Sequence, residues 1–151
     1  MNFSAKTEYG VRVMVELGRQ YGGSPTSLKA ISEAEGLPLS YLEHVVADLK
    51  RAGLVEATRG ARGGYRLQHP PAKIGMDEVV TALEGTLAPM ECFVTLPTSR
   101  VSCSHEGDLG HGCATKLLWT RVQGSVVRAL KGTTLAELVE FSDSHAPVAA
   151  A

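Results

Sequence analysis

The stretch SYLEHVVADLKRAGLVEATRGARGGYR, residues 40–66, decides the fold of this chain. Ser40 and Glu43 have the spacing of a capping box, which predicts that a helix begins here. Gly53 is expected to end this helix as a left-handed residue, with Leu54 packed against the last turn. Between these ends, apolar side chains recur at helical spacing and predict one buried face, formed by Leu42, Val45, Val46 and Leu49.

A hairpin is predicted to follow this helix. The segments LVEATR at 54–59 and GYRL at 64–67 read as short strands, and glycines at 60, 63 and 64 favour a turn between them. A helix with an exposed polar side, followed by a cationic hairpin, suits the major groove of DNA with the hairpin beside it. The candidate DNA contacts are Ser40, Tyr41, Glu43, His44, Lys50, Arg59 and Arg62.

The charge distribution agrees with this interpretation. Residues 50–73 contain six Lys or Arg and one acidic residue, whereas residues 74–151 contain five and nine. Such a local excess of positive charge is expected at a DNA-binding surface. The net charge of −1 argues against a protein that is basic throughout. A solvated basic hairpin without a partner is the alternative.

Two helices are predicted before this stretch. The first begins after Ser4 and runs to about residue 21, with Arg12 and Glu16 spaced for an ion pair. The second begins after Ser27 and ends at Gly36, and the two helices over 27–35 and 40–52 have helix-turn-helix spacing. The predicted fold is therefore mainly α with a small β-hairpin, a winged helix-turn-helix within residues 1–85 that ends in a helix within GMDEVVTALEG, closed by Gly85.

Residues 114–131 form the longest helical pattern, with an apolar stripe that includes Leu118, Val122, Val126 and Leu130. A second capping box, Thr134 with Glu137, predicts a short helix through Phe141, followed by a flexible tail over 142–151. A long amphipathic helix beside a small domain needs a partner, and a second copy is the simplest one. A homodimer also matches the twofold symmetry of palindromic DNA sites. Packing of this helix on its own domain is the alternative.

Three cysteines lie in residues 86–113, in the pattern C-x10-C-x9-C: Cys92, Cys103 and Cys113. This spacing lacks the close pairs of a structural zinc site. Iron–sulfur ligation, redox-active thiols and cysteines without a role all remain open. A cluster normally needs four ligands. The candidates for the fourth are His105, Asp108, His111, Lys116 and, far away in the sequence, Glu8.

Targeting signals are not expected. No segment approaches the ~18 consecutive apolar residues of a membrane span. The start, MNFSAKTEYG, has no apolar region after its charges and does not read as a signal peptide. We therefore expect a cytoplasmic protein with no membrane partner.

The residues described so far resemble the IscR/NsrR-type family of iron–sulfur winged-helix regulators. LSYLEHVVADLKRAGLVEATRGARGGYRL at 39–67 looks like the recognition helix and wing of that family, and of IscR most closely. SAKTEYGVRVMVEL at 4–17 resembles its first helix. C-x5-W from Cys113 to Trp119, with LAELV at 135–139, resembles its cluster and dimer end. The resemblance covers roughly residues 1–141 and joins all three parts in one order.

The resemblance implies roles for particular residues. Ser40, Tyr41 and Glu43 would contact bases or phosphates in the major groove, and Arg59 would reach the adjacent minor groove. The three cysteines would bind an iron–sulfur cluster in the loop over 86–113. The sequence departs from the IscR pattern in a looser cysteine spacing and in Lys116, which stands where IscR has its histidine ligand and is a poor ligand for iron.

Other family members, NsrR among them, use a carboxylate from the first helix of the partner subunit, and Glu8 matches that position. The resemblance thus implies three thiolates and Glu8 in trans, and [4Fe-4S] is favoured over [2Fe-2S].

The sequence predicts a homodimeric transcriptional regulator, and specifically a repressor. Its cluster would sense redox state, nitric oxide or iron–sulfur status, and residues 114–141 would form its dimerisation helix and a short C-terminal helix. One alternative is the same winged-helix regulator without a cluster, sensing by thiol oxidation. Another is a small redox enzyme or electron carrier. The sequence supplies no nucleophile–base pair and no phosphate loop for an enzyme, and we expect none.

Overall fold

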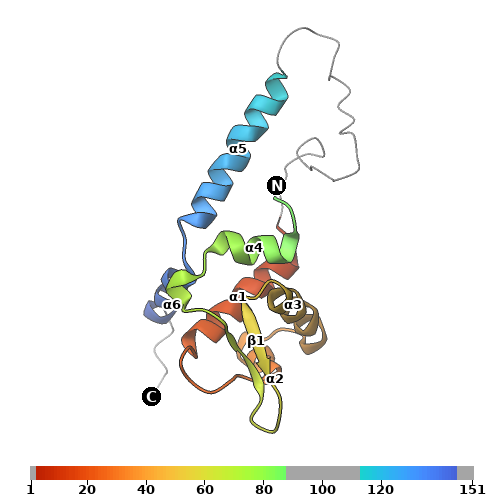
Figure 1. The fold of residues 1–151 in the computed structure, drawn as a ribbon, viewed down its shortest axis with the longest axis vertical. Coiled ribbons are helices and arrows are strands. Elements are labelled where there is room, and N and C mark those ends of the chain that lie inside the picture. Colours follow the sequence, from red (N-terminus) through yellow and green to blue (C-terminus); the bar gives the residue numbers. More distant parts are fainter. Residues whose placement is uncertain (1–2, 88–112, 146–151) are drawn as a thin grey trace.

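The computed structural model describes residues 3–87 and 113–145. Within these ranges the fold is mainly helical with one small antiparallel hairpin, which confirms the predicted fold class (Figure 1). The helices are α1 (Ala5–Arg19), α2 (Leu28–Glu35), α3 (Leu39–Arg51), α4 (Met76–Glu84), α5 (Ala114–Lys131) and α6 (Leu135–Ser144). The strands are β1 (Val55–Thr58) and β2 (Gly64–Leu67), and a 3-10 turn, Pro71–Lys73, precedes α4.

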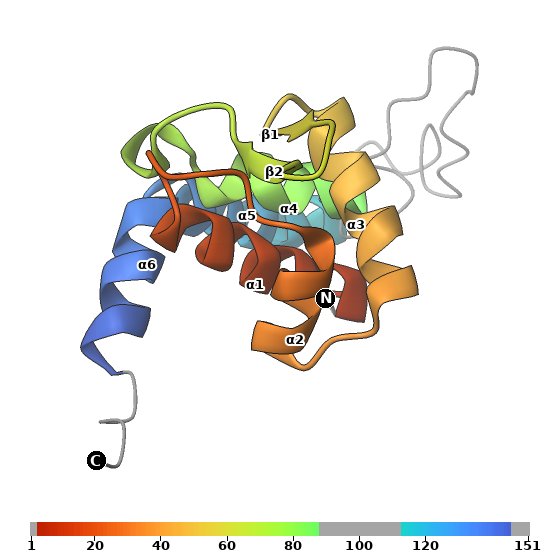
Figure 2. The same ribbon diagram turned by 90° about the horizontal axis from the view of Figure 1, so that it is seen from below.

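Helix α1 lies at the centre of the fold. It contacts α2, α3, α4 and α6, and Figure 2 shows it between α6 on one side and α2 and α3 on the other. Two glycines let neighbouring helices approach closely. A β-carbon on Gly18 would lie 2.6 Å from the Cγ2 methyl of Val139 in α6, and one on Gly10 would collide with Leu83 in α4. The absence of side chains at these two positions therefore sets how near α4 and α6 sit to α1.

The hydrophobic core gathers buried side chains from α1, α2, α3, α4, α6, β1 and β2, and Leu130 of α5 packs against it half-buried. Its fully buried members include Met14, Leu17, Ile31, Leu42, Leu49, Ile74 and Leu135. Burial of a side chain of this size contributes about 1.5–3 kcal/mol of transfer free energy. The predicted apolar face of the recognition helix is confirmed, because each of its four residues is at most 1% exposed. The opposite face of α3 is consequently held at the surface.

Two predicted helix caps differ in the structure, although α1 begins directly after Ser4 as predicted. Helix α3 begins at Leu39 with Pro38 as its N-cap and no side-chain cap, so the predicted capping box at Ser40 is wrong. Ser4 does precede α1, but it does not cap that helix. Its backbone N–H and its hydroxyl each donate to Glu84 Oε1 at 2.7 Å, and the Thr7 hydroxyl donates to the same oxygen at 2.5 Å.

Glu84 thus ties the start of α1 to the end of α4. The hydrogen bonds from Thr7 and Ser4 lower the pKa of the Glu84 carboxyl below its usual value, since they favour the charged form.

The ends of the other helices follow their local chemistry. Ser27 accepts a hydrogen bond from the backbone of Ala30 and caps α2, as predicted. Gly53 is left-handed at φ 75° and follows α3, and Leu54 N–H donates to Leu49 O at 3.0 Å, which confirms the predicted helix end. Helix α6 reaches Ser144, so residues 142–144 are not the tail that was predicted. Residues 146–151 of that tail lie outside the described residues.

The hairpin pairs β1 with β2 in the register Val55↔Leu67, Glu56↔Arg66, Ala57↔Tyr65 and Thr58↔Gly64. A further bridge attaches it to the chain before α2: Thr26 N–H donates to Tyr65 O at 2.9 Å, and Tyr65 N–H donates to Thr26 O at 2.8 Å. Arg66 is engaged in the hairpin itself, with its Nε 2.5 Å from Glu56 Oε1. The wing is therefore fixed to the body close to its turn.

Helix α5 is the exception to this packing. None of its residues is buried, and Leu117 and Leu118 near its start are 57% and 56% exposed. Figure 1 shows its first turns projecting away from the rest of the fold. Its far end is anchored where Met76 N–H donates to Thr133 O at 3.0 Å and Leu135 N–H donates to Ile74 O at 2.9 Å. None of the helices in the described part of the chain has the length and apolarity that a membrane crossing requires.

Candidate nucleic-acid interface

Helix α3 presents the predicted reading residues to solvent. Ser40, Tyr41, Glu43, His44 and Lys50 are all exposed. They are exposed because the apolar residues of α3 occupy the core-facing side at the same helical period. An exposed polar helix face of this kind can enter a major groove and hydrogen-bond base edges.

Glu43 does not have the capping role that its spacing from Ser40 suggested. Because Pro38 rather than Ser40 is the N-cap, Ser40 is the second residue of the helix. Glu43 therefore does not complete a capping box at Ser40. Its exposed carboxylate can accept a hydrogen bond from the N4 amino group of a cytosine.

Tyr41 is held by an aromatic contact that the sequence did not reveal. Its ring meets the ring of Tyr9 in α1 edge to face, with 5.4 Å between the centroids and 80° between the planes. Tyr41 remains 37% exposed, so part of its ring stays available at the surface. The contact fixes the direction of a predicted DNA-binding side chain from outside its own helix.

A partly buried ion pair joins α3 to α1 further along. The Lys6 ammonium contacts the Asp48 carboxylate and donates to the backbone carbonyl oxygen of Leu83 at 3.0 Å. Arg51 Nη1 reaches the other Asp48 oxygen at 2.6 Å. The hydrogen bonds from Lys6 and then Arg51 lower the pKa of the Asp48 carboxyl below its usual value. Asp48 thus stays ionised and links α3 to the first turn of α1.

The wing places two arginines at the surface. Arg59 and Arg62 lie in the exposed turn between β1 and β2, whereas Arg66 is paired with Glu56. The bridge between Thr26 and Tyr65 fixes the hairpin close to the turn that carries them. Guanidinium groups on such a hairpin suit a narrow minor groove or a phosphate backbone.

The predicted metal ligands are only partly within the described residues. Cys92, Cys103, His105, Asp108 and His111 lie outside them. Cys113 is the N-cap of α5, is exposed, and its Sγ accepts the backbone N–H of Lys116 at 3.4 Å. In residues 3–87 and 113–145, no three Cys, His, Asp or Glu side chains gather as a metal site would require. Cluster binding therefore needs residues beyond these ranges, from a second subunit, or both.

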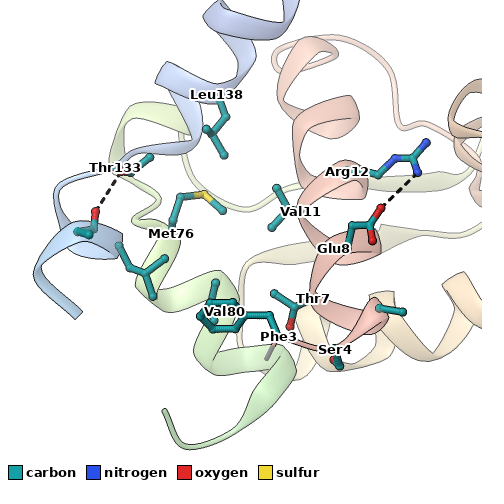
Figure 3. Close-up of a pocket in the computed structure, with 13 residues that line it drawn as sticks. Phe3, Ser4, Thr7, Glu8, Val11, Arg12, Met76, Val80, Thr133 and Leu138 are labelled. Atoms are coloured by element: carbon teal, nitrogen blue, oxygen red, sulfur yellow. Dashed lines mark hydrogen bonds and ion pairs between the residues drawn. The ribbon is translucent and has the colours of Figure 1, made fainter. Parts of the chain in front are cut away.

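Glu8 is among the residues that line a hollow between α1, α4, the end of α5 and α6. The hollow has a volume of about 660 Å³ and a mainly apolar lining that includes Phe3, Val11, Met76 and Leu138, and Figure 3 shows these side chains around it. The Glu8 side chain is 67% exposed, and its carboxylate is 3.9 Å from Arg12 Nη1. Such a weakly held carboxylate is free to take another partner.

Comparison with known proteins identifies the family to which this chain belongs. The family model described as Rrf2, an iron-dependent transcriptional regulator, matches residues 3–141. The chain belongs to the Rrf2 family. The regulator CymR of Bacillus subtilis is 34% identical over 145 residues, which span 96% of this chain and 94% of CymR.

Solved structures of Rrf2-like regulators have the same fold. CymR, described as the global cysteine regulator of B. subtilis, matches with a TM-score of 0.74 at 35% identity, covering 93% of this chain and 98% of that one. IscR of T. potens matches with a TM-score of 0.76 at 32% identity, covering 99% and 94%. An oxidised form of Staphylococcus aureus CymR matches with a TM-score of 0.70 at 34% identity, covering 93% and 97%. This Rrf2 protein is therefore a transcriptional regulator with a DNA-binding winged helix.

The contacts that sequence reasoning missed are those that tie α1 to the two helices of the helix-turn-helix, namely Lys6 with Asp48 and Tyr9 with Tyr41 in α3, and Arg12 with Glu35 in α2. These residues come from segments far apart in the sequence, and each taken alone looks like an ordinary surface residue. No local pattern marks them as partners.

Proposed function

We propose that this Rrf2 protein is a homodimeric repressor that acts in the cytoplasm on a palindromic promoter site. An iron–sulfur cluster would set its affinity for DNA. One combination of features carries the proposal. Helix α3 exposes a polar face that can read DNA, and the same chain exposes a thiol, Cys113, at the start of α5, a helix without buried residues. Sequence relatives that are named as transcriptional regulators give no support to the enzyme alternative.

We propose that the exposed face of α3 binds in the major groove of DNA. Its contact residues would be Ser40, Tyr41, Glu43, His44 and Lys50. The wing arginines Arg59 and Arg62 are assigned to the adjacent minor groove or backbone. A good contact between one of these side chains and a base edge provides about 1–3 kcal/mol of discrimination.

For assembly, we propose that a second copy of this chain packs against the exposed apolar side of α5. A helix without buried residues leaves its apolar area in water unless a partner covers it. This supports a dimerisation region over 114–141, which would follow the winged helix-turn-helix over 1–85 and the proposed cluster loop over 86–113.

For the cluster, the proposed ligands are Cys92, Cys103 and Cys113 of one protomer and Glu8 of the partner subunit. The two described members fit this role, because both side chains are exposed and neither has a strong competing partner. When bound, the cluster supplies iron that is sensitive to oxygen, nitric oxide or iron supply, and an oxygen ligand leaves one iron labile. We favour [4Fe-4S] over [2Fe-2S].

A regulator that senses thiol oxidation without a cluster is the second candidate. It is favoured by the names of two similar structures, one a global cysteine regulator and the other an oxidised form of CymR. An exposed thiol at a helix N-terminus is compatible with this chemistry. The two candidates share the DNA-binding surface and differ in what Cys113 does.

The test is anaerobic purification followed by iron and sulfide analysis, an absorption spectrum and DNA titrations. We expect visible charge-transfer bands in the wild type, loss of the cluster in Cys113→Ser, and a cluster that is lost faster in Glu8→Gln. The matched control is Glu33→Gln, since Glu33 is a similarly exposed carboxylate on α2 with an i,i+4 lysine partner.

A colourless protein that cannot be reconstituted but binds DNA would favour the thiol candidate. In that case DNA binding should respond to oxidant through two of the three cysteines. A cluster that is equally stable in Glu8→Gln and in Glu33→Gln would remove Glu8 from the ligand set. Glu43→Ala should lower discrimination among DNA sequences at one position of the site by about 1–3 kcal/mol, and unchanged discrimination would contradict the assignment of α3.

A further inference from the structure

Glu56 and Arg66 form an ion pair across the two strands of the wing. They lie directly opposite each other in the register of β1 and β2, and Arg66 Nε donates to Glu56 Oε1 at 2.5 Å. Directly opposite residues of an antiparallel pair present their side chains on the same face of the hairpin. The contact therefore needs no change in the backbone of the wing.

The pair lies on the outer face of the hairpin. The neighbouring cross-strand residues, Val55 and Leu67, are 1% and 5% exposed and belong to the core. Because successive side chains of a strand alternate between its two faces, Glu56 and Arg66 lie on the face away from the core. Their side chains are 44% and 56% exposed. Arg66 is thus accessible to a ligand that approaches the wing from outside.

Arg66 differs from the other two arginines of the wing in its pairing. Arg59 and Arg62 lie in the exposed turn. Among the ion pairs that the described residues form, only that of Arg66 involves an arginine of the wing. A guanidinium group binds a carboxylate and a phosphate through the same N–H donors. Glu56 therefore occupies a donor of Arg66 and cancels the positive charge that would attract a DNA phosphate.

An exchange of Glu56 for a phosphate would bring no net gain in charge pairing. If Arg66 turned to the DNA backbone, one guanidinium pair would replace another, and the Glu56 carboxylate would stay unpaired beside the phosphate. Like charges at that separation repel each other. An exposed ion pair contributes little to folding, but the repulsion that follows its opening adds to the cost of the exchange. The pair is therefore expected to stay closed when DNA lies against the wing.

We propose that Arg66 is a phosphate-binding residue of the wing that Glu56 keeps away from the DNA backbone. The inference rests on the proposed function, in which the wing lies against DNA. Phosphate contacts supply the affinity that does not depend on sequence. Glu56 therefore lowers the affinity of the protein for DNA of any sequence, and binding depends more on the base contacts of α3.

The test uses the full chain, a random-sequence duplex and a duplex that the wild type selects from a random pool. The variants are Glu56→Gln, Arg66→Gln and the double variant, and Glu140→Gln is the matched control for charge. Glu140 is an exposed residue of α6, which Figure 2 shows on the other side of α1 from α3. All variants should fold, because the altered side chains lie outside the core, and urea unfolding checks this.

Dissociation constants are measured between about 50 and 200 mM salt. In Glu56→Gln, a freed Arg66 that neutralises one phosphate should steepen the slope of log K against log salt concentration by about 0.9. The gain in affinity should then be about three- to fourfold larger at the lower salt concentration than at the higher one. Arg66→Gln, the double variant and Glu140→Gln should all keep the wild-type slope.

Three results would overturn the inference. A slope that falls by about 0.9 in Arg66→Gln alone would show that Arg66 already contacts a phosphate. An equal change on removal of Glu56 with and without Arg66 would assign the effect to the charge of Glu56 alone. An unchanged slope in Glu56→Gln would show that the freed Arg66 meets no phosphate. If the selected duplex binds no more tightly than the random one, or if the cluster has no effect, the proposed function fails, and the slopes on the random duplex still decide the role of Glu56.

Discussion

Replacement of Gly64 by alanine is expected to detach the wing from the helical body. A β-carbon on Gly64 would lie 2.5 Å from the carbonyl carbon of Thr26 and 2.8 Å from the backbone nitrogen of Ser27. Backbone atoms cannot rotate away as the end of a long side chain can. The bridge between Thr26 and Tyr65, with N···O distances of 2.9 and 2.8 Å, must open to make room.

The magnitude follows from the contacts that are lost. Two backbone hydrogen bonds of about 0.5–1.5 kcal/mol each amount to a fall of about 1–3 kcal/mol in the free energy of unfolding. For a chain of this size that lowers Tm by about 2–12 °C. The pairing of Val55 with Leu67, at the other end of the hairpin, is left intact, which limits the loss. DNA binding should also lose part of its salt dependence, about 0.9 in slope for each phosphate contact that a displaced wing arginine gives up.

The assay is urea unfolding followed by far-ultraviolet circular dichroism, with amide exchange at Thr26 and Tyr65. Gly22→Ala is the control, because Gly22 also has a positive φ of 84° but has open space around its β-carbon position. The loss of stability in Gly22→Ala therefore measures the cost of backbone strain alone. The reasoning is refuted if Gly64→Ala loses no more stability than Gly22→Ala, or if the amides of Thr26 and Tyr65 stay protected.

Three further predictions concern the packing around α1. Glu84→Ala should lower the free energy of unfolding by about 1–3 kcal/mol, since the buried Thr7 hydroxyl loses its acceptor, and Glu84→Gln should lose less in the same urea titration. Because the folded state lowers the pKa of Glu84 from its usual 4.5, its charged form stabilises the protein fully above that value and less as pH falls through the folded pKa. The difference in stability between wild type and Glu84→Gln, measured from pH 7 to pH 3, should therefore shrink toward acid. Leu135→Ala should lower the free energy of unfolding by about 2–5 kcal/mol, measured by thermal unfolding. A decrease below about 1 kcal/mol would show that α6 is not part of the core.

The sequence was most informative where one residue type is required for a local geometry. Gly53 was predicted as a left-handed helix end because few other residues adopt that conformation cheaply, and the structure has it at φ 75°. Ser40 was misjudged because its spacing with Glu43 satisfies the capping pattern, yet Pro38 two residues earlier already fixes the entry into α3. Pro38 has a φ that the helix entry accepts, so the helix starts two residues sooner than the capping pattern indicated.

Contacts between residues that are far apart in the sequence could not be predicted from local sequence patterns. Arg12 was predicted to pair with Glu16 at helical spacing, but it contacts Glu35 and Glu8 instead, and Glu16 pairs with Arg19. The choice depends on where α2 lies against α1, which only the tertiary packing decides. The reading face of α3 was predictable because burial of one helix face dictates exposure of the other. The predicted ligand set stays a prediction, since its members Cys92 and Cys103 lie outside the described residues.

The arrangement around α1 explains how a signal at one place can alter a surface at another. Four consecutive residues of its first turns contact different neighbours: Lys6 contacts Asp48 in α3, Thr7 contacts Glu84 in α4, Glu8 contacts Arg12, and Tyr9 contacts Tyr41 in α3. Since a helix turn is stiff, a change in what one of these side chains binds is shared by the others. A sensor that acts on α1 therefore needs no separate moving part, because α1 already carries the contacts that hold the reading helix in place.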